Sequence, residues 1–224
     1  MTTLSHRPRR HRSRAPILIA VGVVVVVLIA LAIALTIGGG GDDTTTGSTG
    51  GTGADPATTG TVVASGTPLP QLADSGPDPA VGMTFPTLEG VDQQGKPMTI
   101  SAGDGPAMVL FVAHWCPHCQ REVPVVQRWV DDGGLPAGVR LLTVSTAIDP
   151  QAPNYPPDQW LASVGWTAPV LVDADGTGAT AAGLSAYPYF VAVDGAGKVV
   201  QRTTGELTTD QLDAIAAALA PAGH

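Results

Sequence analysis

Cys116 and Cys119 stand in the segment 115–119 (WCPHC) and are the two cysteines of this 224-residue chain. Thiols at this spacing can close a small disulfide ring, and thiolate attack can pass such a disulfide to another protein. Two cysteines are too few for a disulfide-rich scaffold or for a four-cysteine metal site. The residue types therefore point to thiol–disulfide exchange, and the elements around the pair must show whether that interpretation holds.

The cysteine pair is expected at the start of a helix that follows a buried strand. Residues 107–113 (AMVLFVA) form a continuous apolar run long enough for such a strand. A helix should begin at Cys116, with Pro117 at its first position, where the missing N–H costs little. The helix N-terminus stabilises an anion, and cysteines at such sites have pKa values of roughly 3.5–7.5. The sequence therefore predicts Cys116 as the nucleophile and Cys119 as the resolving thiol.

Four other uses of the pair remain as weaker alternatives. A c-type haem site needs histidine directly after the second cysteine, where Gln120 stands, and a peroxiredoxin needs threonine where Ala113 stands. A zinc site of two cysteines and two histidines needs a distant histidine pair, but after position 37 the histidines are His114, His118 and His224. A purely structural disulfide would close too small a loop to stabilise the fold much.

The rest of the folded part indicates an α/β architecture with a central mixed sheet. The helix from Cys116 has Pro124 inside it and should end at 131–134, and Thr208 is the candidate N-cap of a final helix without a full capping box. The other expected elements are extended pieces in 83–100 around a turn at 94–97, strands at 139–145 and 169–172, a short helix at 156–164, one or two helical turns at 178–183, a hairpin of 189–193 with 198–202, and the final helix at 208–219.

Residues 111–119 (FVAHWCPHC) are similar to the thioredoxin-fold active site. Residues 119–124 (CQREVP) match the C-x-x-E-x-P pattern of the membrane-tethered TlpA/ResA-like oxidoreductases, and 82–86 with 95–96 resemble the N-terminal hairpin of that redoxin family. The resemblance covers about 81–220. It implies a thioredoxin-like fold and thiol–disulfide oxidoreductase activity that needs no metal or organic cofactor.

Two departures from the resembled families affect the expected chemistry. Leu110 stands where thioredoxins carry a buried acid, so that proton acceptor is absent. The dipeptide between the cysteines, Pro117-His118, is typical of DsbA-type oxidases rather than of TlpA/ResA-like proteins. The scaffold therefore resembles one family and the dipeptide another.

Glu122 and His118 are the expected partners of the cysteine pair. Glu122 lies three residues after Cys119 and shares its helix face. In the resembled family this position is a buried glutamate that takes up or delivers the proton of the resolving cysteine; a solvated helix carboxylate is the alternative. His118 should stabilise the Cys116 thiolate and make the disulfide more oxidising, unless it merely faces solvent.

The expected substrate-binding residues are Trp115, Pro117, Tyr187 and Pro188. Trp115 should shield the sulfur pair beside a substrate groove, with a core-only role as the alternative, whereas His114 is expected to be an exposed residue without a role. Pro188 precedes the strand 189–193, and the resemblance implies a cis peptide bond there that faces the cysteines. The backbone of Tyr187 would then pair with an extended substrate segment.

The N-terminal part indicates a membrane anchor. Residues 1–16 hold five arginines and no acid, and 17–37 hold no charge. As a helix the second segment spans roughly 32 Å, close to the hydrocarbon thickness of about 30 Å. The positive-inside rule places the N-terminus in the cytoplasm and the rest outside. A cleaved signal peptide, with an A-x-A-like site at 32–34, is the alternative, and both export the folded part.

The remaining boundaries are a disordered Gly/Thr-rich linker at 38–80 and a thioredoxin-like domain at 81–224. The formal net charge of -8, with the basic residues clustered at the N-terminus, argues against nucleic-acid binding. We expect an extracytoplasmic oxidoreductase that acts on protein thiols and disulfides and is recycled by a redox partner in the membrane. The alternatives are a dedicated reductant for cytochrome c maturation and a non-catalytic tethered binding module.

Overall fold

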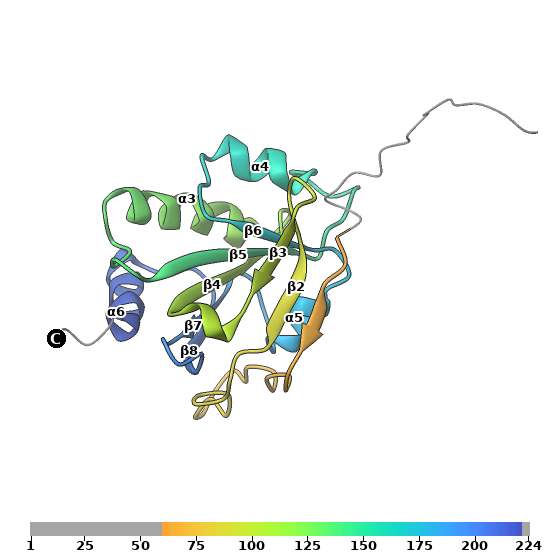
Figure 1. Cartoon of the computed structure of the whole chain (residues 1–224). Helices are drawn as coiled ribbons and strands as arrows, with labels where there is room; N and C mark the ends of the chain where they lie inside the picture. Colours follow the sequence, from red (N-terminus) through yellow and green to blue (C-terminus); the bar gives the residue numbers. More distant parts are fainter. Residues whose placement is uncertain (1–59, 221–224) are drawn as a thin grey trace, which may run out of the picture. The chain divides into compact units, whose positions relative to one another are not determined.

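A mixed β-sheet runs through residues 60–220, the part of the chain that this computed structural model describes (Figure 1). Its strand order is β1-β2-β6-β5-β4-β7-β8, and β3 pairs with β2. The three strands β4, β5 and β6 are parallel, and the other pairings are antiparallel. The strands are β1 (Val63–Ser65), β2 (Thr87–Asp92), β3 (Pro97–Ile100), β4 (Ala107–Val112), β5 (Arg140–Thr146), β6 (Val170–Asp173), β7 (Tyr189–Val193) and β8 (Val199–Thr204).

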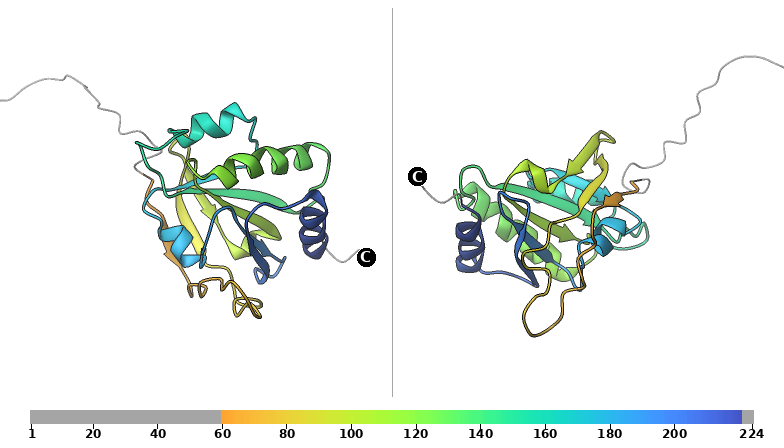
Figure 2. Two further views of the ribbon diagram at one scale, coloured as in Figure 1. Left: turned by 180° about the vertical axis from the view of Figure 1, so that it is seen from behind. Right: turned by 60° about the horizontal axis from the view of Figure 1, so that its bottom comes forward.

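Helices cover both faces of this sheet (Figures 1 and 2). The helices are α3 (Pro117–Asp131), α4 (Pro157–Ser163), α5 (Thr177–Ala181) and α6 (Thr209–Leu219), with a 3-10 turn at Ala102–Asp104. Apolar residues of α3, α4 and α6 belong to one buried cluster, and those of α5 belong to a second. The α/β fold with a central mixed sheet is therefore confirmed.

Strand β4 is the centre of the fold because both faces of it are buried. Met108 and Leu110 point into the cluster that contains α3, and Val109 and Phe111 point into the cluster that contains α5. Successive strand residues face opposite sides, so a strand buried on both sides must be apolar throughout. Burial on both faces explains why residues 107–113 are all apolar. The cysteine pair comes shortly after the end of this run.

The expected elements of the domain are confirmed, with small shifts of their ends. Helix α3 continues through Pro124 and ends at Asp131. One detail was wrong: α6 does have a complete capping box, because the Thr208 side chain accepts from the Gln211 N–H and the Gln211 side chain accepts from the Thr208 N–H. A glutamine at the third helical position can serve in this role as a glutamate does.

The predicted linker at 38–80 extends too far, because residues 60–80 belong to the fold. Strand β1 adds to the edge of the sheet beside β2, and Leu69 is buried and donates its N–H to Ala181. Backbone pairing of an edge strand needs no periodic apolar pattern, so the sequence did not reveal it. Gly183 has a φ of +71° and lies against this segment. Any side chain there would collide with the Pro70 carbonyl oxygen, so only glycine lets the segment pack at this place.

The expected cytoplasmic segment at 1–16, the anchor at 17–37 and the linker residues 38–59 lie outside the described part. Within residues 60–220, no helix is long and apolar enough to cross a bilayer.

A buried ion pair fixes the segment 69–80 to the sheet. The Arg202 side chain is fully buried on β8, and its Nε donates to Asp78 Oδ2 over 2.8 Å. The same guanidinium donates to the Pro70 carbonyl and to the Tyr189 hydroxyl. The hydrogen bond from Arg202, followed by the one from the Ala80 N–H and then by the Arg202 charge, holds the pKa of Asp78 below its ordinary value despite partial burial.

We expect Asp78→Ala to lower the free energy of unfolding by roughly 3 kcal/mol, because it leaves the Arg202 charge buried without its partner. Urea denaturation at neutral pH measures the change. Asp74→Ala is the matched control: Asp74 is exposed in the same segment, and its loss should change stability by less than about 0.5 kcal/mol. Equal effects of the two substitutions would contradict the ion pair's role.

Candidate functional site

The two cysteines lie where β4 passes into α3. Cys116 is the N-cap of α3, Pro117 is its first residue, and Cys119 lies inside its first turn. The cysteines approach to 3.8 Å and both are free thiols. Cys116 is 7% exposed and Cys119 is fully buried. Burial, followed by the influence of Cys116 and Glu122, raises the pKa of the Cys119 thiol far above its ordinary value. Of the pair, Cys116 is thus the thiol that another molecule can reach.

The Tyr187-Pro188 peptide bond is cis, as the resemblance implied, and it lies against Cys116. Cys116 Sγ donates to the Tyr187 carbonyl oxygen over 3.9 Å, across 71 positions of sequence. The carbonyl is thus already directed at the reactive sulfur. The backbone of Tyr187 therefore lies next to the more exposed of the two thiols.

Trp115 lies beside the sulfur on the surface and is not a core residue. Its Nε1 donates to the Ala147 carbonyl over 2.7 Å, and its ring meets the Tyr187 ring edge-on with centroids 6.1 Å apart. The side chain is among the exposed large hydrophobic groups of the described residues. Trp115, Ala147 and Tyr187 therefore form a continuous wall beside Cys116.

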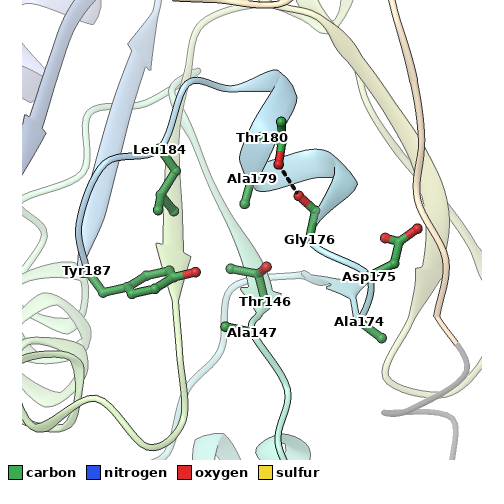
Figure 3. Close-up of a pocket in the computed structure, with 9 residues that line it drawn as sticks. All are labelled: Thr146, Ala147, Ala174, Asp175, Gly176, Ala179, Thr180, Leu184 and Tyr187. Carbon is green, nitrogen blue, oxygen red and sulfur yellow. Dashed lines mark hydrogen bonds between the residues drawn. The ribbon is translucent and has the colours of Figure 1, made fainter. Parts of the chain in front are cut away.

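A pocket of about 290 Å³ has the Tyr187 side chain in its wall (Figure 3). In Figure 3 the phenol and the Thr146 hydroxyl point toward its centre, and α5 closes its upper side. This volume is large enough to admit one amino-acid side chain. The lining residues are Thr146, Ala147, Ala174, Asp175, Gly176, Ala179, Thr180, Leu184 and Tyr187.

Glu122 is buried in α3, so the alternative of a solvated carboxylate is wrong. The residue is 1% exposed, and both carboxylate oxygens accept the Leu207 N–H at 3.1 Å. Burial raises the pKa of Glu122 to about 7, the Leu207 hydrogen bond offsets part of that rise, and the charge of Glu206 adds to it. A carboxyl that titrates near neutral pH one helical turn from a buried thiol can take up or return a proton.

His118 faces solvent at the outer rim of the site. Its side chain is 60% exposed, and its Nδ1 lies 2.7 Å from Glu206 Oε1. The Arg121 guanidinium donates to the same carboxylate through Nε and Nη2. Sequence reasoning missed Glu206 and Arg121, because contacts across 85 and 88 positions leave no local signal.

His114 was expected to be exposed and without a role, and the structure corrects this. The side chain is fully buried. Its Nε2 accepts the Asp149 N–H at 3.1 Å, and its Nδ1 lies 2.8 Å from the Pro153 carbonyl. An N–H only donates and a carbonyl only accepts, so this imidazole is neutral and protonated at Nδ1. His114 thus fixes the 147–157 loop beside the site, and its position directly after an apolar strand was the signal for burial.

Within residues 60–220 no group of three metal-ligating side chains lies close enough to hold a metal ion. The described residues therefore offer no third ligand to a zinc ion bound by Cys116 and Cys119.

Leu110 is buried beneath the site, as its place in β4 requires. On α3, Glu122 is the buried carboxyl that acts electrostatically on the Cys119 thiol.

Comparison with known proteins agrees with this geometry. The Redoxin family model matches residues 80–219. StoA from Bacillus subtilis superimposes with a TM-score of 0.50 at 21% identity, over 61% of this chain and 98% of that one. A protein from Chlorobium tepidum described as a thiol:disulfide interchange protein DsbE gives 0.51 at 21% identity, over 62% and 96%. The thioredoxin domain of a thiol-disulfide oxidoreductase from Bacteroides vulgatus gives 0.50 at 17% identity, over 63% and 99%. These structures share the fold.

In the wild-type protein the free energy of unfolding should fall as the pH rises toward neutral, and we expect Glu122→Gln to abolish this part of the pH dependence. The pKa of Glu122 rises from 4.5 to about 7 on folding, so the folded state binds this proton more tightly. Stability therefore falls as pH increases from about 4.5 through 7. Between pH 5 and pH 8 the wild-type protein should lose about 2 kcal/mol more than the variant.

Urea denaturation of the reduced proteins at the two pH values measures this difference. Asp131→Asn, at the exposed end of the same helix, is the control and should keep the wild-type pH dependence. Equal pH dependence of Glu122→Gln and the wild type would show that Glu122 titrates as in an unfolded chain.

Proposed function

This chain belongs to the redoxin family and is a thiol–disulfide oxidoreductase, and we propose that it exchanges disulfides with exported proteins from a membrane anchor. The observation that carries the proposal is the arrangement around Cys116. A slightly exposed sulfur at a helix N-terminus faces the carbonyl of Tyr187, and a buried thiol and a carboxyl with a pKa raised to about 7 lie behind it. A non-catalytic binding module would not need such a carboxyl.

In the oxidising direction, a substrate thiolate attacks Cys116 Sγ of the Cys116–Cys119 disulfide. A bond forms between the substrate sulfur and Cys116 while the Cys116–Cys119 bond breaks, and Cys119 leaves as a thiolate. A second substrate thiolate then attacks the substrate sulfur of the mixed disulfide and releases Cys116 as a thiolate. Two electrons have passed from the substrate dithiol to the protein, and the reverse sequence reduces a substrate disulfide.

Glu122 supplies the proton that these steps require at Cys119. The leaving Cys119 thiolate is buried, where a charge is costly, so it is stabilised by taking a proton from the Glu122 carboxyl. In the reverse direction the carboxylate accepts the Cys119 proton as the thiolate forms and attacks. A pKa of about 7 leaves both forms of Glu122 populated at neutral pH, which serves both directions.

The wall beside Cys116 binds the substrate segment. The backbone of Tyr187 lies next to the cis peptide bond and offers its groups to an extended chain, while Trp115 and Pro117 flank the sulfur. One substrate side chain beside the reacting cysteine then enters the pocket behind Tyr187. All residues of this substrate-binding wall and pocket lie within residues 60–220.

The anchor and the compartment belong to the same proposal. The arginine-rich segment 1–16 and the uncharged segment 17–37 support a single span with the folded part outside the cytoplasm. A disulfide donor in that compartment must be recharged, and we propose a membrane redox partner that accepts electrons from the reduced pair.

The Cys119→Ser variant tests the proposal most simply. A mixed disulfide formed through Cys116 then lacks its resolving thiol and accumulates. We expect non-reducing gels of cells that express the full chain to show adducts with exported proteins in the membrane fraction. These adducts should disappear on reduction and in the Cys116→Ser variant.

Adducts confined to cytoplasmic proteins would contradict the proposed compartment. A complete lack of adducts, with no insulin reduction by the wild-type protein above the level of Cys116→Ser, would contradict exchange itself and favour a binding module.

We expect Thr180→Trp to weaken the reaction with protein substrates and to spare small disulfides. Thr180 is exposed on α5 and lines the pocket, so an indole there fills the space without disturbing the core. The KM for a protein disulfide should rise about tenfold, equivalent to ~1.4 kcal/mol of lost binding. The rate with glutathione disulfide should stay within about twofold.

Thr180→Ser is the matched control, because it keeps the hydroxyl that donates to the Gly176 carbonyl. Equal loss with both disulfides would show that the pocket does not serve polypeptide binding.

A further inference from the structure

The Glu206 carboxylate binds both polar side chains at the rim of the active site. Its Oε1 lies 2.7 Å from His118 Nδ1 and accepts from Arg121 Nη2 over 2.6 Å. Glu206 stands in the loop between β8 and α6, and the N–H of the next residue, Leu207, binds the buried Glu122. Two adjacent residues of one loop thus bind the exposed and the buried polar neighbours of the cysteine pair.

The charge of Glu206 reaches the reacting groups. The hydrogen bond from Arg121, followed by that from His118, lowers the pKa of Glu206, so this carboxylate is ionised at neutral pH. Arg121 in turn feels the Cys116 sulfur electrostatically, and Glu206 acts on Glu122 in the same way. The charged and titratable groups around Cys116 on the described elements are His118, Cys119, Arg121, Glu122, Tyr187 and Glu206.

We propose that Glu206 is a positioning residue that holds His118 and Arg121 and offsets the positive charge of Arg121, so that the disulfide is less oxidising than its CPHC sequence alone would make it. This inference rests on the proposed function, because it concerns the redox potential of the same cysteine pair. It also places the determinant of that potential outside the C-x-x-C motif.

The direction of the effect follows from charge. Positive charge near Cys116 stabilises its thiolate, and a stable thiolate favours the dithiol over the disulfide. In the reaction with glutathione, the protein disulfide and two glutathione thiols give the protein dithiol and one glutathione disulfide, with transfer of two electrons. Removing the Glu206 charge leaves the Arg121 cation uncompensated and should shift this equilibrium toward the protein dithiol.

The test is Glu206→Gln in the full-length protein purified in detergent. We expect its equilibrium constant with glutathione to shift about three- to tenfold toward the dithiol, which corresponds to ~15–30 mV more oxidising for a two-electron couple. The midpoint of Cys116 thiolate formation, followed by ultraviolet absorbance, should move to lower pH. Both shifts should shrink at high salt, because the carboxylate is exposed.

Three variants separate this effect from a structural one. Glu89→Gln removes the same charge from an exposed position on β2, three strands from β4, and should leave the potential unchanged. Glu206→Asp keeps the charge and should retain most of the wild-type potential. In an Arg121→Gln background the effect of Glu206→Gln should become smaller, because the arginine charge that Glu206 offsets is then already absent.

An unchanged or less oxidising Glu206→Gln protein would overturn the inference. The proposed function is judged separately by insulin reduction with the wild-type protein. If the wild type exchanges disulfides and the potential does not respond to Glu206, only the inference fails; if the wild type does not exchange them, the proposed function fails as well.

Discussion

The first two turns of α3 bury one thiol and one carboxyl that would both be charged or hydrated in water. Cys119 and Glu122 lie behind the strand end that presents Cys116, and burial raises the pKa of each. Burial makes a negative charge on either group unfavourable, and two negative charges side by side would be worse still. Each group is therefore more easily ionised when the other holds a proton, and this couples their protonation. The rest of the active site surrounds this pair and keeps water from it.

Loops from distant parts of the chain complete the site. Tyr187 supplies a carbonyl to Cys116, Leu207 supplies an N–H to Glu122, and His114 holds the 147–157 loop beside Trp115. Tyr187 lies just before β7, Leu207 just after β8, and His114 just after β4. The sheet therefore determines how far apart these residues lie. A rigid sheet with both faces buried is what allows such separate contacts to meet within a few ångströms.

Residues with a local signal were predicted well from the sequence, and residues that act through long-range contacts were not. The apolar run of β4, the C-x-x-C pair and Pro117 at the helix start have fixed spacing, and the structure places them as expected. Glu206 escaped notice because only folding brings it to His118. Strand β1 escaped because edge pairing uses the backbone, and His114 was misjudged because its partners lie in a loop without periodicity.

The central claim is that Glu122 exchanges a proton with Cys119 near neutral pH. Carbon-13 NMR of the Glu122 side-chain carboxyl in the reduced protein, followed across a pH titration, tests it directly. The account predicts a titration midpoint near the value of about 7 that burial imposes. A midpoint near the ordinary value of 4.5 would contradict it, because a carboxylate already ionised throughout the neutral range has no proton to give to the leaving thiolate.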